Sequence, residues 1–542
     1  MNSASLLITS IGGARRPLRG HLNALCAAGG ALVRRSLARC SLLLLALSMV
    51  EPLHGQLVGA QPDSSVKAAL AHIVDDRELA SLRWPQLGDV ADELFQFYSA
   101  RDWAPAWSTG SVPTKSAAAT LEVLRTIGTR GLDPPDYDVE RLTQLAKARL
   151  TTDALRAEFD ATLSTASLRA LRSLGHGRVS ATEAHADLRF PEDSPDYVPI
   201  IAALVTSPDP RTRFDEQEPP HMHYQLLKQE LARYQARNPG DSVVRERIGQ
   251  IALSMERWRW LPRLITGHPI IVNIPAFTLH AFTSASDSAA DMLTMDAVVG
   301  NALFHRTPVF SDMLEYIEFA PYWNVPSSIA SAELLPVAMR DPHLLTVNNY
   351  EIVSARGKVL PASHKTIKQV LERNAFIRQL PGGTNALGRV KFMFPNEFDV
   401  YLHDTPVTAA FLHDRRDLSH GCIRIAQPAA LARLLLRDQP AWDSTAIASA
   451  MDGRTPVRVT LTHPVPVYVI YATAVAHEGR QVEFFDDIYG YDAELSKLIA
   501  RGYPYQTNSG IAAARNLVKS TRDSTLKATR SAPGSRHERS RP

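Results

Sequence analysis

The chain has 542 residues, of which 45% are apolar and 21% are charged, a composition typical of globular proteins. This length exceeds one ordinary domain and predicts about two to four units. The formal net charge of +3 divides into +5 for residues 1–60, +6 for residues 515–542 and −8 for the body between them. Nucleic-acid enzymes usually carry basic charge on the folded body, so this distribution disfavours that class and predicts no nucleic-acid partner.

Residues 1–60 have the pattern of an export signal. Six arginines and no acidic residue precede the apolar stretch Ser41–Val50. That stretch has the length of a signal-peptide core and is too short to span a bilayer. The small residues of Val58-Gly59-Ala60 predict cleavage before Gln61, and an uncleaved anchor is the alternative.

The cysteine count singles out one thiol. Cys26 and Cys40 fall in the predicted leader, so a processed chain keeps only Cys422. A single thiol in an exported protein cannot form an internal disulfide. Cys422 is then either a small buried hydrophobe or a reactive group, and its sequence neighbours favour the second interpretation.

The first half of the chain is predicted to be helical. Apolar residues recur at helical spacing in four segments: Val66–Ile73, Val90–Tyr98, Ala118–Ile127 and Leu155–Leu174. No catalytic constellation is found among them. We therefore predict a helical scaffold domain over residues 61–237, followed by a linker helix over residues 238–267.

From Ile270 onward the residue pattern predicts strands instead of helices. The β-branched and aromatic segments are Ile270–Ile274, Val298–Gly300, Tyr316–Phe319, Val390–Phe394, Val400–His403, Val457–Leu461, Val467–Ala474 and Gln481–Phe485. The expected fold class is α+β, in which a mainly antiparallel β sandwich or barrel over residues 268–450 follows the helical domain. A partly helical insertion is expected over about residues 326–380, with Ile329–Arg340 its clearest helix. Residues 451–514 are expected to complete or flank the β domain.

Two short segments carry the residue types of nucleophilic catalysis. His403 ends a predicted strand, and Cys422 lies in a tight turn marked by Gly421. Although nineteen positions separate them, a base on an adjacent strand can reach such a turn. A thiol attacks only as a thiolate, which a neighbouring imidazolium or arginine stabilises. We therefore predict Cys422 as nucleophile and His403 as general base and acid.

The neighbours of these two residues suit supporting roles. Backbone amides around Gly421 and Cys422 can hold the oxyanion of a tetrahedral intermediate. His420 is a candidate to shape that pocket. Arg424 is a candidate to bind a substrate carboxylate, because its planar fork matches that group.

A metal site is the nearest enzymatic alternative. Six potential ligands lie within twenty positions: His403, Asp404, His413, Asp414, His420 and Cys422. No pair of histidines has the i, i+4 spacing of a helical zinc site, and no paired-cysteine pattern is present. The sequence therefore favours a thiol enzyme without metal or cofactor.

The hexapeptide Ser419-His420-Gly421-Cys422-Ile423-Arg424, with His403 upstream, resembles the signature of the L,D-transpeptidase (YkuD) family. Further segments resemble the large periplasmic subgroup of that family, which carries an N-terminal scaffold domain. They are Gly131–Pro134, Met255–Pro262, Asn273–Phe277, Thr307–Asp312, Pro321–Pro326, Asn385–Phe392 and Phe485–Gly490. The resemblance covers most of residues 90–500.

The resemblance implies a reaction on peptidoglycan, in cell-wall biogenesis and cell shape. Cys422 is expected to attack the third stem residue of a tetrapeptide donor, releasing D-Ala and leaving a thioester. A diaminopimelate amine on a neighbouring stem then resolves the thioester and forms a 3→3 cross-link. His403 is carried over as general base, and Ser419, His420, Gly421 and Arg424 as supporting residues. Carbapenems are expected as covalent inhibitors.

The same resemblance places the mature protein in the periplasm of a Gram-negative bacterium and makes residues 326–380 a lid over the cleft. Two departures stand out. Only Asn238–Leu253 lies where subgroup members carry a peptidoglycan-binding module, which is too short for a three-helix unit. His420 stands where some members have serine.

Two other functions remain open from the sequence. Water or a free D-amino acid could resolve the same acyl-enzyme, which would give a carboxypeptidase or an exchange enzyme. A catalytically silent scaffold that recruits partners at the wall is disfavoured, because His403 and Cys422 are both present. Residues 515–542 are Ser-, Arg- and Thr-rich and predict a disordered basic tail, either simply solvated or in weak contact with an anionic wall or membrane surface.

Overall fold

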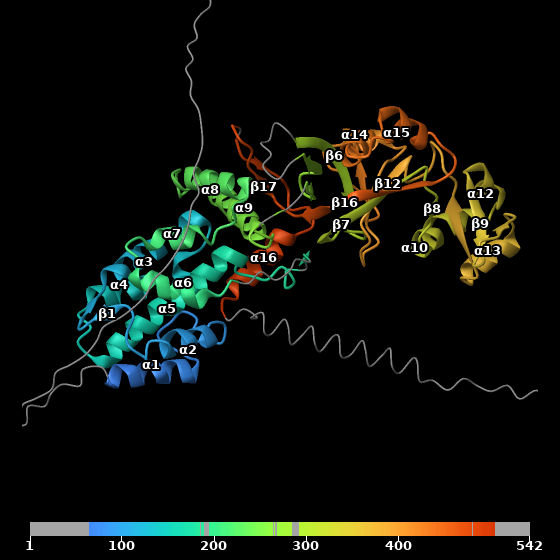
Figure 1. Ribbon diagram of the computed structural model, residues 1–542. Coiled ribbons are helices and arrows are strands. Elements are labelled where there is room, and N and C mark those ends of the chain that lie inside the picture. Colours follow the sequence, from blue (N-terminus) through green and yellow to red (C-terminus); the bar gives the residue numbers. More distant parts are fainter. Residues whose placement is uncertain are drawn as a thin grey trace, which may run out of the picture. The chain divides into compact units, whose positions relative to one another are not determined.

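The computed structural model describes residues 64–503, apart from residues 185, 189–194, 264, 266–267, 284–291 and 480. The predicted leader over residues 1–60 and the predicted tail over residues 515–542 lie outside this part of the chain. Helices dominate as far as residue 258 and strands from residue 270 onward (Figure 1). The expected α+β class is confirmed. Within the described ranges no helix is both long and apolar enough to cross a membrane.

The N-terminal region is built from helices around α5. The helices are α1 Ser64–Asp76, α2 Ala91–Ser99, α3 Lys115–Arg125, α4 Val139–Lys147, α5 Asp153–His176, α6 Tyr197–Thr206, α7 Pro210–Asp215, α8 Met222–Gln235 and α9 Ser242–Trp258. Two 3₁₀ turns, Ile127–Arg130 and Pro134–Tyr137, and the two-residue strands β1 Ser108–Thr109 and β2 Val112–Pro113 lie between them. Helix α5 is buried on all sides, which is typical of a central core helix. Thr152 caps its start, and Gly177 with a positive φ of 86° ends it.

A buried carboxylate fixes one loop of this region. Asp160, on α5, accepts hydrogen bonds from the amides of Ala106 and Trp107 at 2.9 and 2.8 Å and from the Tyr98 hydroxyl at 3.0 Å. Burial raises the pKa of Asp160 to about 6, although these hydrogen bonds oppose the shift. The side chain therefore ties the loop before β1 to the core.

The C-terminal region contains a closed ring of strands. In ring order these are β12 Val390–Met393, β13 Leu402–His403, β15 Ile423–Ile425, β6 Met292–Gly300, β5 Thr278–Phe282, β4 Ile270–Asn273, β16 Val457–Ile470 and β7 Val309–Phe319. The ring closes because β12 pairs with both β13 and β7. Within it, β13–β15 and β16–β4 are parallel and the other pairs are antiparallel. The prediction of a mainly antiparallel barrel is confirmed.

Further elements surround the barrel. Strand β3, Ala186–Asp187, pairs with β7, and β14, Asp417–Ser419, pairs with β6. Helices α14, Pro428–Leu435, and α15, Ser444–Met451, contribute Leu431 and Ile447 to the same core as the barrel strands. The chain then continues through β17, Ala474–Val475, β18, Glu483–Phe484, and α16, Tyr491–Ala500.

The insertion between β7 and β12 is a small unit of its own. It contains β8 Trp323–Asn324, α10 Ser327–Ile329, the π-helical turn η4 Ala330–Leu334, α11 Leu335–Ala338, α12 His343–Val347, β9 Tyr350–Ser354, β10 Val359–Leu360, α13 His364–Leu371 and β11 Ala375–Gln379. Its strands form a four-stranded antiparallel sheet in the order β10-β9-β11-β8. Figure 1 shows α12 and α13 beside β9.

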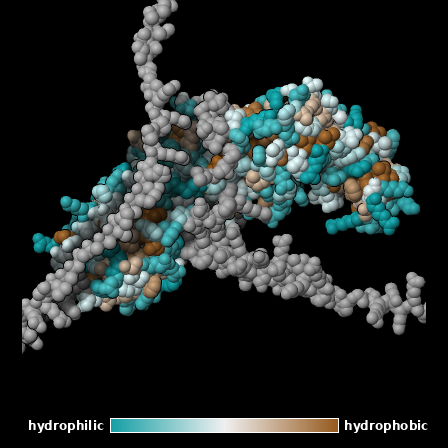
Figure 2. Space-filling view, in the orientation of Figure 1, coloured by the Kyte–Doolittle hydropathy of each residue, from teal (hydrophilic) through white to brown (hydrophobic). Residues whose placement is uncertain are grey.

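The insertion is partly helical, as expected, but it also contains this sheet, which was not predicted. The predicted helix Ile329–Arg340 is divided between α10, η4 and α11, with Pro336 in the first turn of α11. Strands β9 and β11 bury Ile352 and Ile377 in a separate core, and only β11 shows the two-residue alternation of a half-buried strand. The insertion also leaves Val347 and Leu371 more than half exposed, and apolar residues lie among the hydrophilic ones on the surface in Figure 2.

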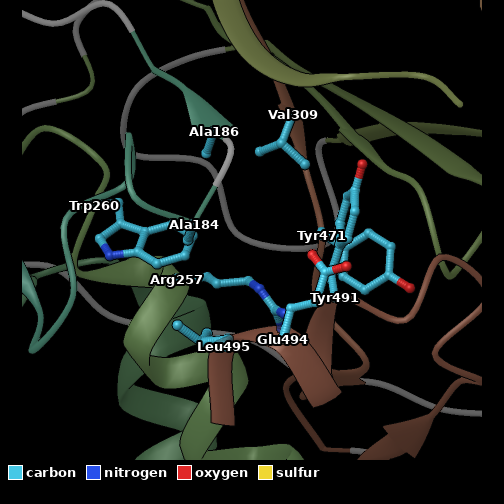
Figure 3. A pocket seen from close by; sticks show the side chains of 9 residues that line it. All are labelled: Ala184, Ala186, Arg257, Trp260, Val309, Tyr471, Tyr491, Glu494 and Leu495. Carbon is cyan, nitrogen blue, oxygen red and sulfur yellow. The ribbon is translucent and has the colours of Figure 1, made fainter. Parts of the chain in front are cut away.

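A pocket lies where the helical region, the barrel and α16 meet. Its lining includes Arg257, Trp260, Tyr471, Tyr491 and Glu494 (Figure 3). Arg257 is paired with Asp492 of α16 at 2.5 Å. None of the predicted site residues lines this pocket, so we treat it as part of the junction between elements.

Candidate active site

Strands β13 and β15 bring the two principal site residues together. Their parallel register sets His403 opposite Arg424. The amide of Ile423, one residue before Arg424, donates at 3.1 Å to the carbonyl of Tyr401, two residues before His403. Cys422 precedes Ile423 and so lies beside the strand that carries Tyr401 and His403.

The burial pattern shows which face of these strands carries the site. Leu402 and Ile423 are fully buried in the barrel core. Because side chains alternate along a strand, the neighbours His403 and Cys422 project to the opposite face. The structure thus brings the predicted nucleophile and base to one face of two adjacent strands.

His403 is held in one orientation by a main-chain oxygen. Its side chain is buried, and Nδ1 lies 2.5 Å from the carbonyl oxygen of Asp404. A carbonyl can only accept, so this hydrogen bond requires the proton on Nδ1 and leaves Nε2 as the basic nitrogen. Burial and the nearby charge of Arg424 lower the pKa of His403 to about 3, so the ring is neutral at pH 7.

Cys422 is a half-buried thiol. Its Sγ lies 3.6 Å from the carbonyl oxygen of Asp399, to which the thiol donates. Burial raises the pKa of the thiol, while a hydrogen bond with the Tyr401 hydroxyl and the charge of Arg424 partly oppose that shift. A raised thiol pKa beside a neutral imidazole means that the pair rests uncharged. An uncharged pair favours a mechanism in which the thiol loses its proton during attack over one that starts from a thiolate already formed.

Ser419 closes the turn that presents Cys422. Its hydroxyl donates to the carbonyl oxygen of Cys422 at 2.5 Å and accepts from the amide of Gly421 at 3.2 Å. Gly421 has a φ of 111°, which a side chain at this position would strain. The Gly421 amide already donates to the Ser419 hydroxyl, so only one of the two expected oxyanion donors remains. No hydrogen bond from the Cys422 amide occurs among the described residues, so this amide remains the candidate donor.

A second set of hydrogen bonds supports the turn from behind. The buried Thr307 hydroxyl donates to the Gly421 carbonyl at 2.8 Å and accepts from the Gly300 amide at 2.8 Å. The Tyr489 hydroxyl donates to the Gly300 carbonyl at 2.5 Å and accepts from the Thr307 amide at 3.1 Å. Sequence reasoning gave Thr307 and Tyr489 no role, although both lie in segments that carry the resemblance.

The loop before β12 holds the other side of the site. The side chain of Asp404 accepts from the Arg389 amide at 2.8 Å. Gly388 has a φ of 63°, and a Cβ at this position would collide with the Asp404 side chain. The close approach of Gly388 thus fixes Asp404, whose carbonyl oxygen orients His403.

Arg424 is a cation whose hydrogen-bond donors are not all used. Its side chain is half-buried, and its Nε is buried with no hydrogen-bond partner among the described residues. Burial lowers the pKa of Arg424, although the guanidinium remains charged. Its position opposite His403 suits the predicted binding of a substrate carboxylate.

His420 points to the insertion. Its Nε2 lies 2.8 Å from a carboxylate oxygen of Glu333 in η4, and its ring centre lies 4.8 Å from that of His305. His305 and Glu333 were not among the predicted site residues. No local sequence pattern identifies them, because the contact joins three segments distant in the chain. Nowhere in the described ranges is a group of three or more His, Cys, Asp or Glu side chains arranged to hold a metal ion.

The architecture is thus a helical domain followed by a closed β barrel that carries a thiol and an imidazole on adjacent strands. Residues 92–231 match the family model of the Scaffold domain, and residues 268–459 match that of the L,D-transpeptidase catalytic domain. The chain therefore carries a scaffold domain followed by a catalytic domain of the L,D-transpeptidase family, as the sequence resemblance predicts.

A curated relative agrees with this assignment. A protein of Haemophilus influenzae, whose name assigns it provisionally to the L,D-transpeptidases, is 29% identical over 247 residues. The aligned part covers 46% of this chain and 49% of that protein. The chain thus spans about half the length of the curated relative that it matches.

Proposed function

We propose that the protein is an L,D-transpeptidase that forms 3→3 cross-links between peptidoglycan stem peptides through an acyl-enzyme on Cys422. The observation that carries this proposal is the register of β13 and β15, which puts Cys422 and His403 on one face. The hydrogen bond from His403 Nδ1 to Asp404 leaves Nε2 as the base. The catalytic-domain family match over residues 268–459 supports the substrate class.

In the first half-reaction, His403 Nε2 takes the thiol proton as Cys422 Sγ attacks the carbonyl carbon of the third stem residue. The carbonyl oxygen gains a negative charge that the Cys422 amide is placed to stabilise. The imidazolium then returns the proton to the amine of the leaving D-Ala, the carbon–nitrogen bond breaks and a thioester remains. Arg424 suits the terminal carboxylate of the donor, which lies close to the bond that breaks.

In the second half-reaction, the side-chain amine of diaminopimelate on another stem attacks the thioester. The carbon–sulfur bond breaks, an amide forms and Cys422 returns to the thiol. His403, with a pKa far below 7, is a weak base for a free thiol, and the charge of Arg424 adds to that weakness although it favours the thiolate of Cys422. The oxyanion donor must therefore stabilise the charge that develops during attack. Either water or a D-amino acid as acceptor would give hydrolysis or exchange by the same route.

The test is intact-protein and muropeptide mass spectrometry on the purified chain beside Cys422→Ala. Each protein is incubated with disaccharide-tetrapeptide and, separately, with a carbapenem. We expect a covalent adduct and 3→3 dimers with the wild type only. An adduct with tripeptide as sole product would replace this proposal with a carboxypeptidase. Folded protein that forms neither adduct nor product would refute it and favour a silent scaffold.

We also propose that the protein acts in the periplasm of a Gram-negative bacterium, where its polymer substrate lies. The support is the arginine-rich and apolar pattern of residues 1–60, which lie outside the described part of the chain. Cell fractionation, with N-terminal sequencing of the mature chain, tests both export and cleavage before Gln61. Recovery of full-length chain from the cytoplasm alone would contradict the proposal.

A further inference from the structure

Three titratable side chains meet beside the nucleophile turn, on the side that faces the insertion. His420 belongs to the turn and lies two positions before Cys422. Its Nε2 lies 2.8 Å from Glu333 Oε1 of the insertion, and its ring is tilted by 42° over His305 at 4.8 Å. Unlike the buried His403, the side chains of His420 and Glu333 are 40% and 52% exposed, so a ligand from solvent can reach them.

The turn also brings His305 close to the nucleophile. The nearest atom to a Cβ built on Gly421 is the carbonyl oxygen of His305, at 4.0 Å. Thr307, two residues further along, donates to the Gly421 carbonyl at 2.8 Å. The segment of His305 and the turn of Cys422 are therefore held together, and the cluster has a fixed position relative to the thiol.

The second half-reaction has a requirement that the Cys422–His403 pair does not meet. An alkyl amine has a pKa of about 10, so the acceptor arrives as an ammonium ion and cannot attack. It must lose one proton before attack and a second one as the amide forms. His403 can accept the second proton. The first needs another acceptor, and the ammonium ion needs an anion that binds it.

We propose that Glu333 and His420 form the binding site for the acceptor ammonium ion, with Glu333 contributed by the insertion. This inference rests on the proposed function. The carboxylate of Glu333 binds the ammonium ion by a charge-assisted hydrogen bond, and the imidazole of His420 accepts one of its protons. The resulting imidazolium is paired with Glu333 until the proton passes to water, while the neutral amine attacks the thioester.

The charge arrangement around Cys422 is consistent with two different substrates. Arg424 offers a positive charge with an unpartnered Nε on the strand after the nucleophile. Glu333 offers a negative charge against His420, two residues before Cys422. A donor that ends in a carboxylate is attracted to the first, and an acceptor that carries an ammonium ion is attracted to the second. Selection of an amine over water then depends on the insertion, since it supplies the carboxylate.

The experiment measures the two half-reactions separately in the purified full chain, for the wild type, Glu333→Gln and His420→Gln. Acylation is followed by intact mass spectrometry with disaccharide-tetrapeptide. Resolution is followed with disaccharide-tripeptide as acceptor and, in parallel, with hydroxylamine, a weakly basic amine that is mostly uncharged at neutral pH. Glu372→Gln is the matched control, because Glu372 lies on the same insertion and is 50% exposed.

We expect Glu333→Gln to raise the KM for the tripeptide acceptor by about tenfold, the effect of losing one charge-assisted hydrogen bond. His420→Gln should lower the rate of that step, and Glu333→Gln should leave resolution by hydroxylamine within about twofold of the wild type. A variant that slows both acceptors equally would show that the contact merely shapes the turn, and unchanged tripeptide kinetics would also overturn the proposal. A wild type that forms no acyl-enzyme would instead refute the proposed function.

Discussion

The Nδ1 of His403 and the carbonyl oxygen of Asp404, the next residue, lie 2.5 Å apart. The imidazole of His403 is thus oriented by main-chain groups, the carbonyl of Asp404 at its own strand end and the backbone of Leu387. Asp404 is itself fixed through the Arg389 amide and the close approach of Gly388. This arrangement makes the orientation of His403 depend on the loop that contains Gly388 and Arg389.

The first prediction concerns His403. In His403→Gln the base is lost but the fold should persist, because the amide nitrogen of glutamine can still donate to a carbonyl. We expect acylation by disaccharide-tetrapeptide to slow by about 10²–10⁴-fold, the usual contribution of a general base. The rate of adduct formation by intact mass spectrometry checks this. A rate within tenfold of the wild type, with an unchanged melting temperature, would contradict the assigned role.

The second prediction is the pH dependence of the thiol. Burial raises the pKa of Cys422, so the thiolate fraction at pH 7 should be smaller than in an unfolded peptide. Alkylation by iodoacetamide should therefore be slow at neutral pH. The alkylation rate should continue to increase with pH above the pKa of an ordinary cysteine, which is about 8.5. Arg424→Gln should move the profile to higher pH, because the cation favours the thiolate. A plateau in the wild-type rate below pH 8 would contradict the uncharged resting pair.

The third prediction compares two glycines of one loop. Gly388→Ala should place a methyl group against Asp404 and should strain a backbone with φ of 63°. We expect a loss of stability of about 1–3 kcal/mol and slower acylation, because the oxygen that orients His403 must move. Gly383→Ala is the control, since a Cβ there meets nothing within 4 Å. Equal behaviour of the two variants in urea unfolding and acylation would show that the close approach has no effect on the site.

The fourth prediction concerns the helical domain. Asp160→Ala removes the acceptor of two buried amides and of the Tyr98 hydroxyl. Each buried donor left without a partner costs about 1–3 kcal/mol, so we expect a loss of several kcal/mol in unfolding free energy. Asp75→Ala, at an exposed position of α1, should change stability by less than about 0.5 kcal/mol. Chemical denaturation measures both, and a loss below about 1 kcal/mol for Asp160→Ala would contradict the proposed anchoring of the loop.

Local patterns in the sequence were sufficient for the class of fold and for the residue types of the site. The spacing of apolar residues predicts the helices of the first half, and β-branched runs predict strands such as β4 and β16. Closure of the barrel could not be predicted, because it depends on β12 pairing with both β7 and β13, and β13 has only two residues. The sheet of the insertion was missed for a related reason, since its strands are short and pair across a helix.

The candidate site shows the same limit. The hexapeptide around Cys422 and the strand end at His403 can be identified locally. The contact between His420 and Glu333 joins segments 87 positions apart, and the hydrogen bond between Tyr489 and Gly300 joins segments 189 apart. Contacts between such distant segments leave no repeating pattern in the sequence from which they could be predicted. Only the folded backbone brings them together.

The hydroxyl of Tyr489 also bears on where the catalytic unit ends. The family match stops at residue 459, yet this hydroxyl lies thirty residues further on and holds both Gly300 and Thr307 behind the nucleophile turn. The Tyr471 hydroxyl in turn accepts from the Tyr489 amide at 2.9 Å and donates to Asp487 at 2.6 Å. A fragment cut at the edge of the matched segment would keep every residue of the signature hexapeptide and lose the support beneath it. The smallest fragment that keeps the hydrogen bonds behind the nucleophile turn therefore extends at least through Tyr489.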